Sequence, residues 1–185
     1  MIDDSSQKIL NLLIENGIEV KPGLKEKDFK HIESAFKAKL PEDYKKFLNH
    51  GVPTGKGFPD WYHPKKEAKN TRKWIDRAFR FDIEENNYWL DEFGIKPSQS
   101  REATRRALKI IRKWPTLFPV YSHRFIPSDP AKSDNPVISL HQVTDSIIYG
   151  ANLEEYFMNE FKKDNDVHIK RTNTSIPYWG DALDL

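Results

Sequence analysis

The sequence of 185 residues contains no cysteine, which excludes disulfide bonds and metal sites built from thiolates. It also lacks a long hydrophobic run, since no segment approaches the roughly 20 apolar residues that a membrane-spanning helix requires. The first residues carry acidic side chains and do not show the basic start and apolar stretch of a secretory signal peptide. We therefore expect a soluble, cytoplasmic protein without a membrane partner.

The composition is sufficient for a folded core, because 37% of the residues are hydrophobic and 12% are aromatic. The net charge of +2 is too small to favour nucleic acid as the partner, but the charge is unevenly spread. Residues 65–80 carry seven Lys/Arg against two acids, and residues 101–113 carry six against one, so each segment has a local charge of +5. Residues 145–185 carry eight acids against four bases, a local charge of −4. The chain thus has a basic middle and an acidic end.

Apolar residues at helical spacing predict that the first two thirds of the chain is mainly helical. The predicted helices cover residues 5–17, 25–40, 41–51, 65–79, 83–94 and 98–114. Pro41 should end one helix and begin the next, because proline disfavours helical geometry in the preceding residue and suits a first helical position. Tyr44, Phe47 and Leu48 share one face of the new helix and are expected to be buried.

Later in the chain the apolar spacing changes to that of strands. Residues 116–123 indicate a strand in which Pro119 favours an edge position, and residues 135–142 and 147–150 indicate a hairpin. A helix over 152–161 follows, with Asn152 as its N-cap. The predicted fold class is α+β: a small, mostly antiparallel sheet packed with helices, a helical N-terminal half and a helical insertion in the middle.

The stretch "LPEDYKKFL" at 40–48, the helix before it, and the later "NPVISL" and "NLEEYFMNEF" together carry a family resemblance. This order of elements resembles the SUKH superfamily, which includes Smi/Knr-like fungal cell-wall regulators and many bacterial toxin-immunity proteins. The resemblance covers residues 22–51 and 117–161. It implies a single SUKH-like domain over 1–185 with a helical insertion at about 58–115, where the sequence departs from the family pattern.

The resemblance implies a non-enzymatic interaction protein, an immunity protein that binds and neutralises a cognate polymorphic toxin. Many toxins neutralised by this superfamily are nucleases, so a nuclease is one expected partner. The alternative is a nucleic-acid-binding or cell-wall-synthesis regulatory domain that uses the basic middle region. Salt-dependent binding to bulk nucleic acid would distinguish this alternative.

Two features of the middle region could form a partner-binding site. The loop "FPDWYHP" carries Trp61 and Tyr62, which could act as interface anchors, although partial burial of the loop against the core is the favoured interpretation. The helix at 98–114 places Arg105, Lys109 and Arg112 on one side, which could contact phosphates or an acidic protein, or could form an ordinary solvated face.

The sequence contains no recognisable catalytic or metal-binding pattern. The six histidines lack the His-x-x-x-His spacing of a zinc site, and His50 and His63 could converge only across a loop. Ser122 and His123 are neighbours on a predicted strand, where side chains alternate, so we do not expect them to hydrogen-bond. We therefore expect no enzyme activity, no cofactor and no metal.

Overall fold

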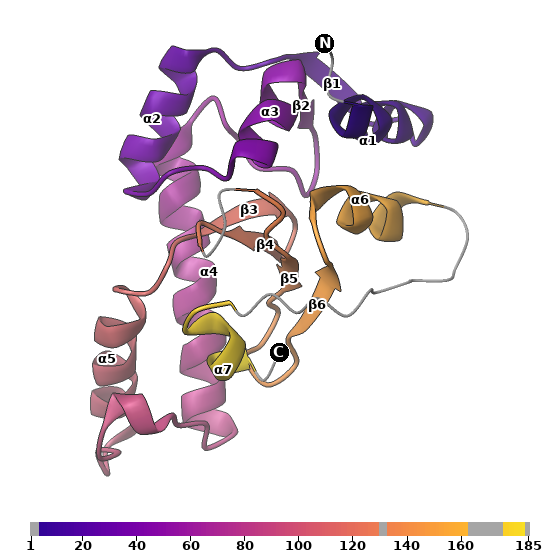
Figure 1. The fold of residues 1–185 in the computed structure, drawn as a ribbon. Helices are drawn as coiled ribbons and strands as arrows, with labels where there is room; N and C mark the ends of the chain where they lie inside the picture. Colours follow the sequence, from indigo (N-terminus) through magenta and orange to yellow (C-terminus); the bar gives the residue numbers. More distant parts are fainter. Residues whose placement is uncertain (1–3, 130–132, 163–175, 184–185) are drawn as a thin grey trace.

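The computed structural model describes residues 4–129, 133–162 and 176–183 and has an α+β fold with two antiparallel sheets (Figure 1). The elements, in chain order, are α1 (Asp4–Glu15), β1 (Glu19–Pro22), α2 (Glu26–Phe36), α3 (Glu42–His50), β2 (Gly51–Thr54), α4 (Pro64–Glu85), the 3-10 helix η1 (Asp91–Phe93), α5 (Ser100–Ile111), β3 (Leu117–Tyr121), β4 (Arg124–Pro127), β5 (Val137–Ser139), β6 (Ile147–Gly150), α6 (Leu153–Phe161) and α7 (Trp179–Leu183). The predicted fold class is confirmed.

The larger sheet has four strands in the order β3-β4-β5-β6, each antiparallel to its neighbour. The predicted hairpin is confirmed, because Ile138 of β5 pairs with Ile148 of β6. Pro119 lies on β3, an edge strand, and the register shifts just after it. An edge position tolerates proline because the missing N–H is not needed for pairing on the open side.

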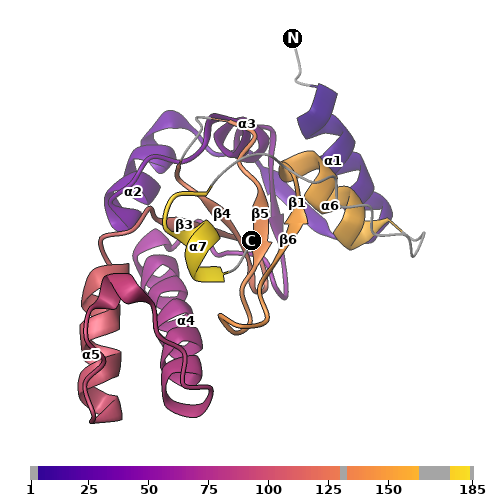
Figure 2. The same cartoon turned by 60° about the horizontal axis from the view of Figure 1, so that its bottom comes forward.

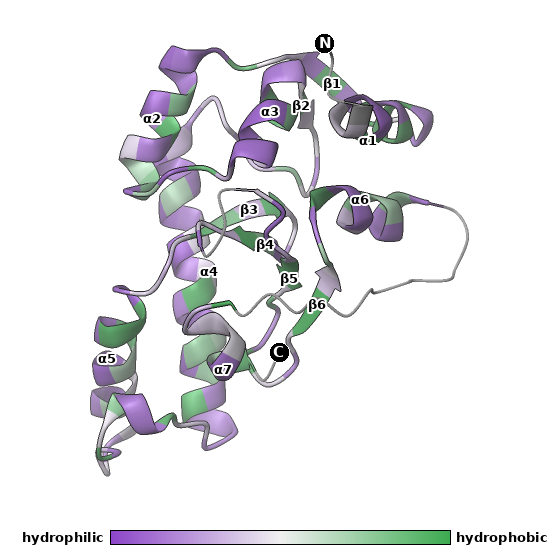
Figure 3. Ribbon diagram, in the orientation of Figure 1, coloured by the Kyte–Doolittle hydropathy of each residue, from purple (hydrophilic) through white to green (hydrophobic). Residues whose placement is uncertain are grey.

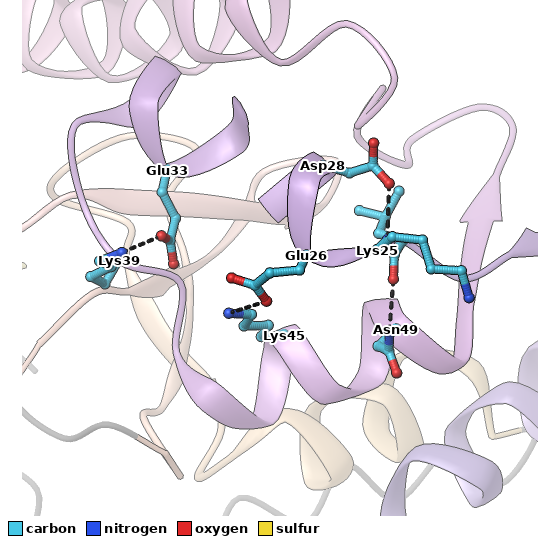
Figure 4. A network of polar contacts seen from close by, with 8 residues as sticks. Lys25, Glu26, Asp28, Glu33, Lys39, Lys45 and Asn49 are labelled. Carbon is cyan, nitrogen blue, oxygen red and sulfur yellow. Dashed lines mark hydrogen bonds and ion pairs between the residues drawn. The ribbon is translucent and has the colours of Figure 1, made fainter. Parts of the chain in front are cut away.

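Helices α2 and α3 are tied together by polar contacts as well as by their apolar faces (Figure 4). Lys45 of α3 lies 3.1 Å from Glu26 of α2, and the Asn49 side chain donates to the Leu24 carbonyl at 2.7 Å. The Asp28 carboxylate accepts from the Lys25 N–H at 2.9 Å, which satisfies a backbone donor at the start of α2. These contacts help to hold α2 and α3 in place over the first part of the apolar core.

The predicted stripe on α3 is buried, since Tyr44, Phe47 and Leu48 are each 1% exposed. The junction between α2 and α3 differs in detail from the prediction. Helix α2 ends at Phe36 with Lys37 in the left-handed region (φ 58°), and Pro41 is the N-cap of α3 rather than its first helical residue. The extended backbone of Pro41 (ψ 141°) gives the chain its change of direction before α3.

The smaller sheet pairs β1 with β2, and the sequence did not predict either strand. Glu19 pairs with Thr54 and Pro22 with Gly51, so the two paired strands are separated in the sequence by α2 and α3. Gly23 follows β1 and passes the end of α3 so closely that a Cβ would lie 1.7 Å from the Asn49 carbonyl oxygen. The Leu24 N–H then donates to the Leu48 carbonyl at 2.9 Å, which anchors this crossing.

Two helix predictions in the middle of the chain are wrong. Helix α4 continues to Glu85, beyond the predicted end at 79, and the predicted helix at 83–94 is reduced to η1. The Asp82 carbonyl accepts from both the Asn86 and Tyr88 N–H groups, which closes α4 and turns the chain. The N-cap of α5 is Gln99, which makes no side-chain capping hydrogen bond.

The core consists of two hydrophobic clusters, and α4 contributes to both. The first cluster gathers α1, α2, α3, α6 and one side of the four-stranded sheet, and Ala68 from the N-terminal part of α4 packs against it. The second gathers α5, α7 and one side of the sheet and includes Ala78, Phe79 and Ile83 from the C-terminal part of α4. Figure 3 shows hydrophobic and hydrophilic residues alternating along α4 and α5, as expected for amphipathic helices.

A buried carboxylate joins α4 to the loop between β5 and β6. Asp82 is fully buried and accepts from the Val143 N–H at 2.6 Å and the Thr144 hydroxyl at 2.7 Å. The Asn86 amide donates at 2.6 Å to the same Asp82 oxygen as the Thr144 hydroxyl, and the Val143 N–H donates to the other oxygen. Several donors around one carboxylate compensate for its removal from water.

Candidate partner-binding surface

Helices α4 and α5 lie side by side and extend beyond the four-stranded sheet (Figure 1 and Figure 2). They run in opposite directions, because the Thr104 hydroxyl donates to Glu84 at 3.1 Å while Arg112 lies 3.1 Å from Asp76. Ala103, Ala107 and other small or aliphatic residues of α5 are buried, and its basic residues stay exposed. Helix α5 therefore buries its apolar residues and exposes its basic side chains to solvent.

A groove of about 610 Å³ runs between the two helices, and four of its nine lining residues are arginines. Its charged lining residues are Arg80, Glu84, Arg101, Glu102, Arg105 and Arg112. Arg112 is engaged with Asp76, but within the described parts of the chain no acidic group lies within 4.0 Å of the Arg80, Arg101 or Arg105 guanidinium. Three permanently charged groups thus line a concave surface without an ion-pair partner among the described residues.

The five residues that the sequence proposed do not form one surface. Arg105 and Arg112 line the groove, and Lys109 is exposed on the same helix without lining it. Tyr62 is 49% exposed but precedes α4, whereas α5 packs beside the C-terminal half of α4. Since the 22 residues of α4 span about 33 Å, Tyr62 and the groove lie towards opposite ends of this helix.

Trp61 is not an exposed anchor, and this prediction is corrected. Its side chain is 3% exposed and lies in the first hydrophobic cluster. Its ring centroid is 5.8 Å from that of Phe36 and 6.0 Å from that of Tyr44, in tilted and edge-on geometries that aromatic pairs favour. The loop carries Trp61 inward because burying an indole against two rings is worth more than exposing it.

Sequence reasoning did not select Arg80 and Arg101 as site residues. Arg80 belongs to the first basic segment and Arg101 to the second, and only the packing of α4 against α5 brings them to one groove. The local charge of each segment was the available signal. The charge alone could not show which half of the basic segment 65–80 lies beside α5, because this depends on how far α4 continues beyond residue 80.

Ser122 and His123 are in contact, contrary to the prediction. They form the two-residue turn between β3 and β4, with Ser122 at φ 50°, so strand alternation does not apply to them. The Ser122 hydroxyl oxygen lies 3.3 Å from His123 Nδ1, and an Arg124 guanidinium nitrogen contacts His123 Nε2.

These contacts determine what the pair can do chemically. Arginine has only donors, so Nε2 of His123 must accept, and the imidazole proton then resides on Nδ1, facing Ser122. In this tautomer Nδ1 donates to the Ser122 hydroxyl oxygen and cannot accept its proton, so His123 cannot act as a general base towards Ser122. Burial, with the neighbouring Arg124 and His141, lowers the pKa of His123 to about 4.

Among residues 4–129, 133–162 and 176–183, no group of three or more His, Asp or Glu side chains is arranged to hold a metal ion. His50 contacts the Lys46 carbonyl through Nδ1 at 2.8 Å, and His63 contacts Asp60 at 2.8 Å. Each imidazole is thus engaged locally. Of the acidic end proposed from the sequence, residues 163–175 and 184–185 lie outside the described residues.

Comparison with known proteins found no matching family model, no matching curated protein and no matching solved structure. The resemblance to the SUKH superfamily therefore stays a prediction from sequence. Within the described part of the chain, no helix has the length and apolar character needed to cross a membrane.

Proposed function

We propose that this chain is a non-enzymatic interaction protein that binds and neutralises a protein toxin, and that the groove between α4 and α5 contacts that partner. The observation that carries the proposal is the set of Arg80, Arg101 and Arg105 around one concave surface without ion-pair partners among the described residues. The resemblance of residues 40–48 and 152–161 to immunity proteins supplies the class of partner.

Arginine suits this role because its guanidinium is charged at all physiological pH values and binds carboxylates with two parallel hydrogen bonds. A partner that presents Asp or Glu side chains to the groove would gain charge-assisted bonds in a site partly shielded from water. Complementary charge would also accelerate association, which matters when a toxin must be captured before it acts.

The acidic residues of the groove favour a protein over a uniform polyanion. Glu84 and Glu102 lie among the arginines, so a continuous phosphate backbone would meet repulsion at these points, whereas a protein surface can match both signs. The arginines of the groove disfavour direct contact with the substrate cleft of a nuclease, because that cleft is itself basic. If the toxin is a nuclease, we expect the groove to contact an acidic patch outside that cleft.

Binding of single-stranded nucleic acid is the second candidate. A neighbouring groove of about 410 Å³ is lined by Trp74, Arg77, Arg80 and Phe81, and Phe81 is 44% exposed. Aromatic rings beside arginines can stack bases while the guanidinium groups contact phosphates. Glu84 and Glu85 also line this groove and weaken that interpretation.

The test is co-expression with the product of the neighbouring gene, followed by measurement of growth and of one-to-one binding. The double substitution Arg80→Glu and Arg105→Glu should weaken binding by about 100-fold or more and abolish rescue of growth. Lys65→Glu with Lys66→Glu is the matched control, since it makes the same change in net charge in the first turn of α4.

Loss of rescue in both variants would show that net charge, and not the groove, is responsible. A neighbouring product that is not toxic, or that does not bind, would overturn the immunity proposal. Salt-sensitive binding of a labelled single-stranded oligonucleotide that the groove substitutions abolish would then favour the second candidate.

A further inference from the structure

The groove between α4 and α5 has a buried floor and charged, accessible rims. Thr104 and Leu108 line the groove at 3% and 5% exposure and form its floor, whereas the arginines and glutamates that line it are all exposed. The three guanidinium groups without an ion-pair partner among the described residues can therefore contact a segment that lies in the groove.

The residues that α5 contributes to the groove follow one stripe of that helix. Arg101, Arg105, Leu108 and Arg112 recur at intervals of four, three and four residues, the spacing that places side chains on one side of an α-helix. At a rise of about 1.5 Å per residue, this stripe is about 16 Å long, or three turns. Figure 2 shows α4 beside α5 along this length, so the groove is elongated rather than round.

Both acids of the groove already have contacts within the chain. Glu84 accepts from the Thr104 hydroxyl at 3.1 Å, and Glu102 lies 3.8 Å from Arg106. Positive charge is thus what remains to be matched by a partner.

The positions of two arginines add to this need for an anion. Arg101 and Arg105 are four residues apart on α5, and like charges at this spacing destabilise a helix. A carboxylate placed between the two guanidinium groups would remove this repulsion and would accept charge-assisted hydrogen bonds from both.

The absence of free backbone groups along most of the groove favours a helical occupant. Beyond the first turn of α5, the backbone N–H and C=O groups of α4 and α5 are paired within each helix. An extended segment would leave the backbone groups that it turns towards the groove without partners, whereas a helix satisfies its own. Docking of an amphipathic helix into a groove between helices is a recurrent mode of recognition.

We propose that the groove receives an acidic, amphipathic helix of the partner protein, about three turns long. Its acids stand on one stripe at helical spacing, opposite Arg80, Arg101 and Arg105, and an apolar residue of the same stripe contacts Leu108. This inference rests on the proposed function for the existence of a protein partner, and it adds the structural class of the segment that docks.

The experiment measures binding of a labelled peptide to the full-length protein by fluorescence anisotropy. The peptide has about 15 residues of alanine and glutamine, with glutamates and one leucine on a single stripe, and a hydrocarbon staple on the opposite side holds it helical. We expect saturable binding that weakens at least about ten-fold in the variant Arg80→Glu with Arg105→Glu, because each guanidinium loses a carboxylate. Lys65→Glu with Lys66→Glu, the variant with the same change in net charge, should leave the affinity unchanged.

Two control peptides separate helical docking from general attraction to a basic surface. One has the same composition with its glutamates distributed around the stapled helix, and the other has no staple and a central proline, which prevents helix formation. Each should bind at least about ten-fold more weakly than the striped peptide, because its acids cannot all face the groove. Equal binding of the proline peptide would identify an extended acidic segment as the occupant and would overturn the proposal, as would no binding of the striped peptide.

This inference and the proposed function fail in different experiments. If the groove substitutions abolish rescue of growth while the striped peptide binds no better than its controls, the helical occupant is refuted and the proposed function stands. If the striped peptide binds in the groove but the neighbouring product is not toxic or does not bind, the proposed function fails and the preference of the groove for an acidic helix remains.

Discussion

At the scale of single residues, Gly23 makes the tightest approach of the eight glycines. Because a Cβ at this position would lie 1.7 Å from a backbone oxygen, Gly23→Ala must push β1 away from the end of α3. We expect it to lower the free energy of unfolding in urea by about 3–5 kcal/mol. Gly180→Ala, where a Cβ meets nothing within 4 Å, should change it by no more than about 1 kcal/mol. Equal effects would mean that Gly23 has room to adjust.

His123 predicts a pH dependence whose sign follows from its lowered pKa. In the unfolded chain its pKa is near 6.5, whereas burial and the adjacent Arg124 lower it to about 4 in the fold. Between these values the unfolded state binds more protons, so this contribution to stability is complete above pH of about 6.5 and is lost as the pH falls towards about 4. His123→Gln should flatten the curve of unfolding free energy against pH in that window.

The measurement is urea denaturation across this pH range for the wild type, His123→Gln and His31→Gln. The His31 substitution removes an exposed histidine and controls for the loss of one imidazole. If the slope between pH of about 4 and 6.5 is the same in the wild type and His123→Gln, His123 is not the group that links stability to pH there.

Residue burial was partly predictable from the sequence. The Tyr44 stripe was recognised because three apolar residues recur at helical spacing. Trp61 was named as a possible interface anchor because a Gly/Pro loop has no periodicity, so nothing in it distinguishes an indole that faces inward from one that faces water. The contact between Ser122 and His123 was missed because the exact position of the β3–β4 turn was not predicted.

At the scale of elements, the Asp82 carboxylate fastens α4 to the loop after β5. Asparagine at this position offers a single acceptor oxygen and turns an amide N–H₂ towards other donors. We expect Asp82→Asn to destabilise the fold by about 2–4 kcal/mol in chemical denaturation, because buried donors lose their acceptor. Asp145→Asn, exposed in the same loop, should have little effect. A loss below about 1 kcal/mol for Asp82→Asn would show that these donors find other partners.

Helices with long apolar periodicity were predictable, and so was the β5–β6 hairpin, because each signal lies within one short segment. The pairing of β1 with β2 was not, since it joins residues about 30 positions apart through two four-residue strands. The end of α4 was misplaced because its last turns are rich in charged and polar residues. The carboxylate of Asp82, which is buried through contacts distant in sequence, gave no local sign of its role.

At the scale of the whole molecule, the α+β class was predictable because the spacing of apolar residues changes along the chain from that of helices to that of strands. The candidate site followed only in part. Two basic segments were evident, yet their joint groove depends on the antiparallel packing of α4 and α5, which places Arg80 and not Lys65 beside α5. The number of charges in each segment cannot show which basic residues lie beside α5, because that depends on where α4 ends and on which of its sides faces α5.

The placement of α4 in both hydrophobic clusters has a consequence for how the molecule opens. A helix whose two halves are held by different clusters cannot lose one half of its packing without weakening the other, so the clusters should unfold in one cooperative transition. Amide hydrogen exchange can test this, because the Phe79 amide would then exchange only when the entire chain unfolds.

Under that condition Gly23→Ala, a change beside the first cluster, should accelerate exchange at Phe79 in the second cluster by the full loss in global stability. Unchanged protection at Phe79 would show that the two clusters open independently. Full coupling would mean that a ligand bound beside either half of α4 stabilises the other half against proteolysis and thermal opening.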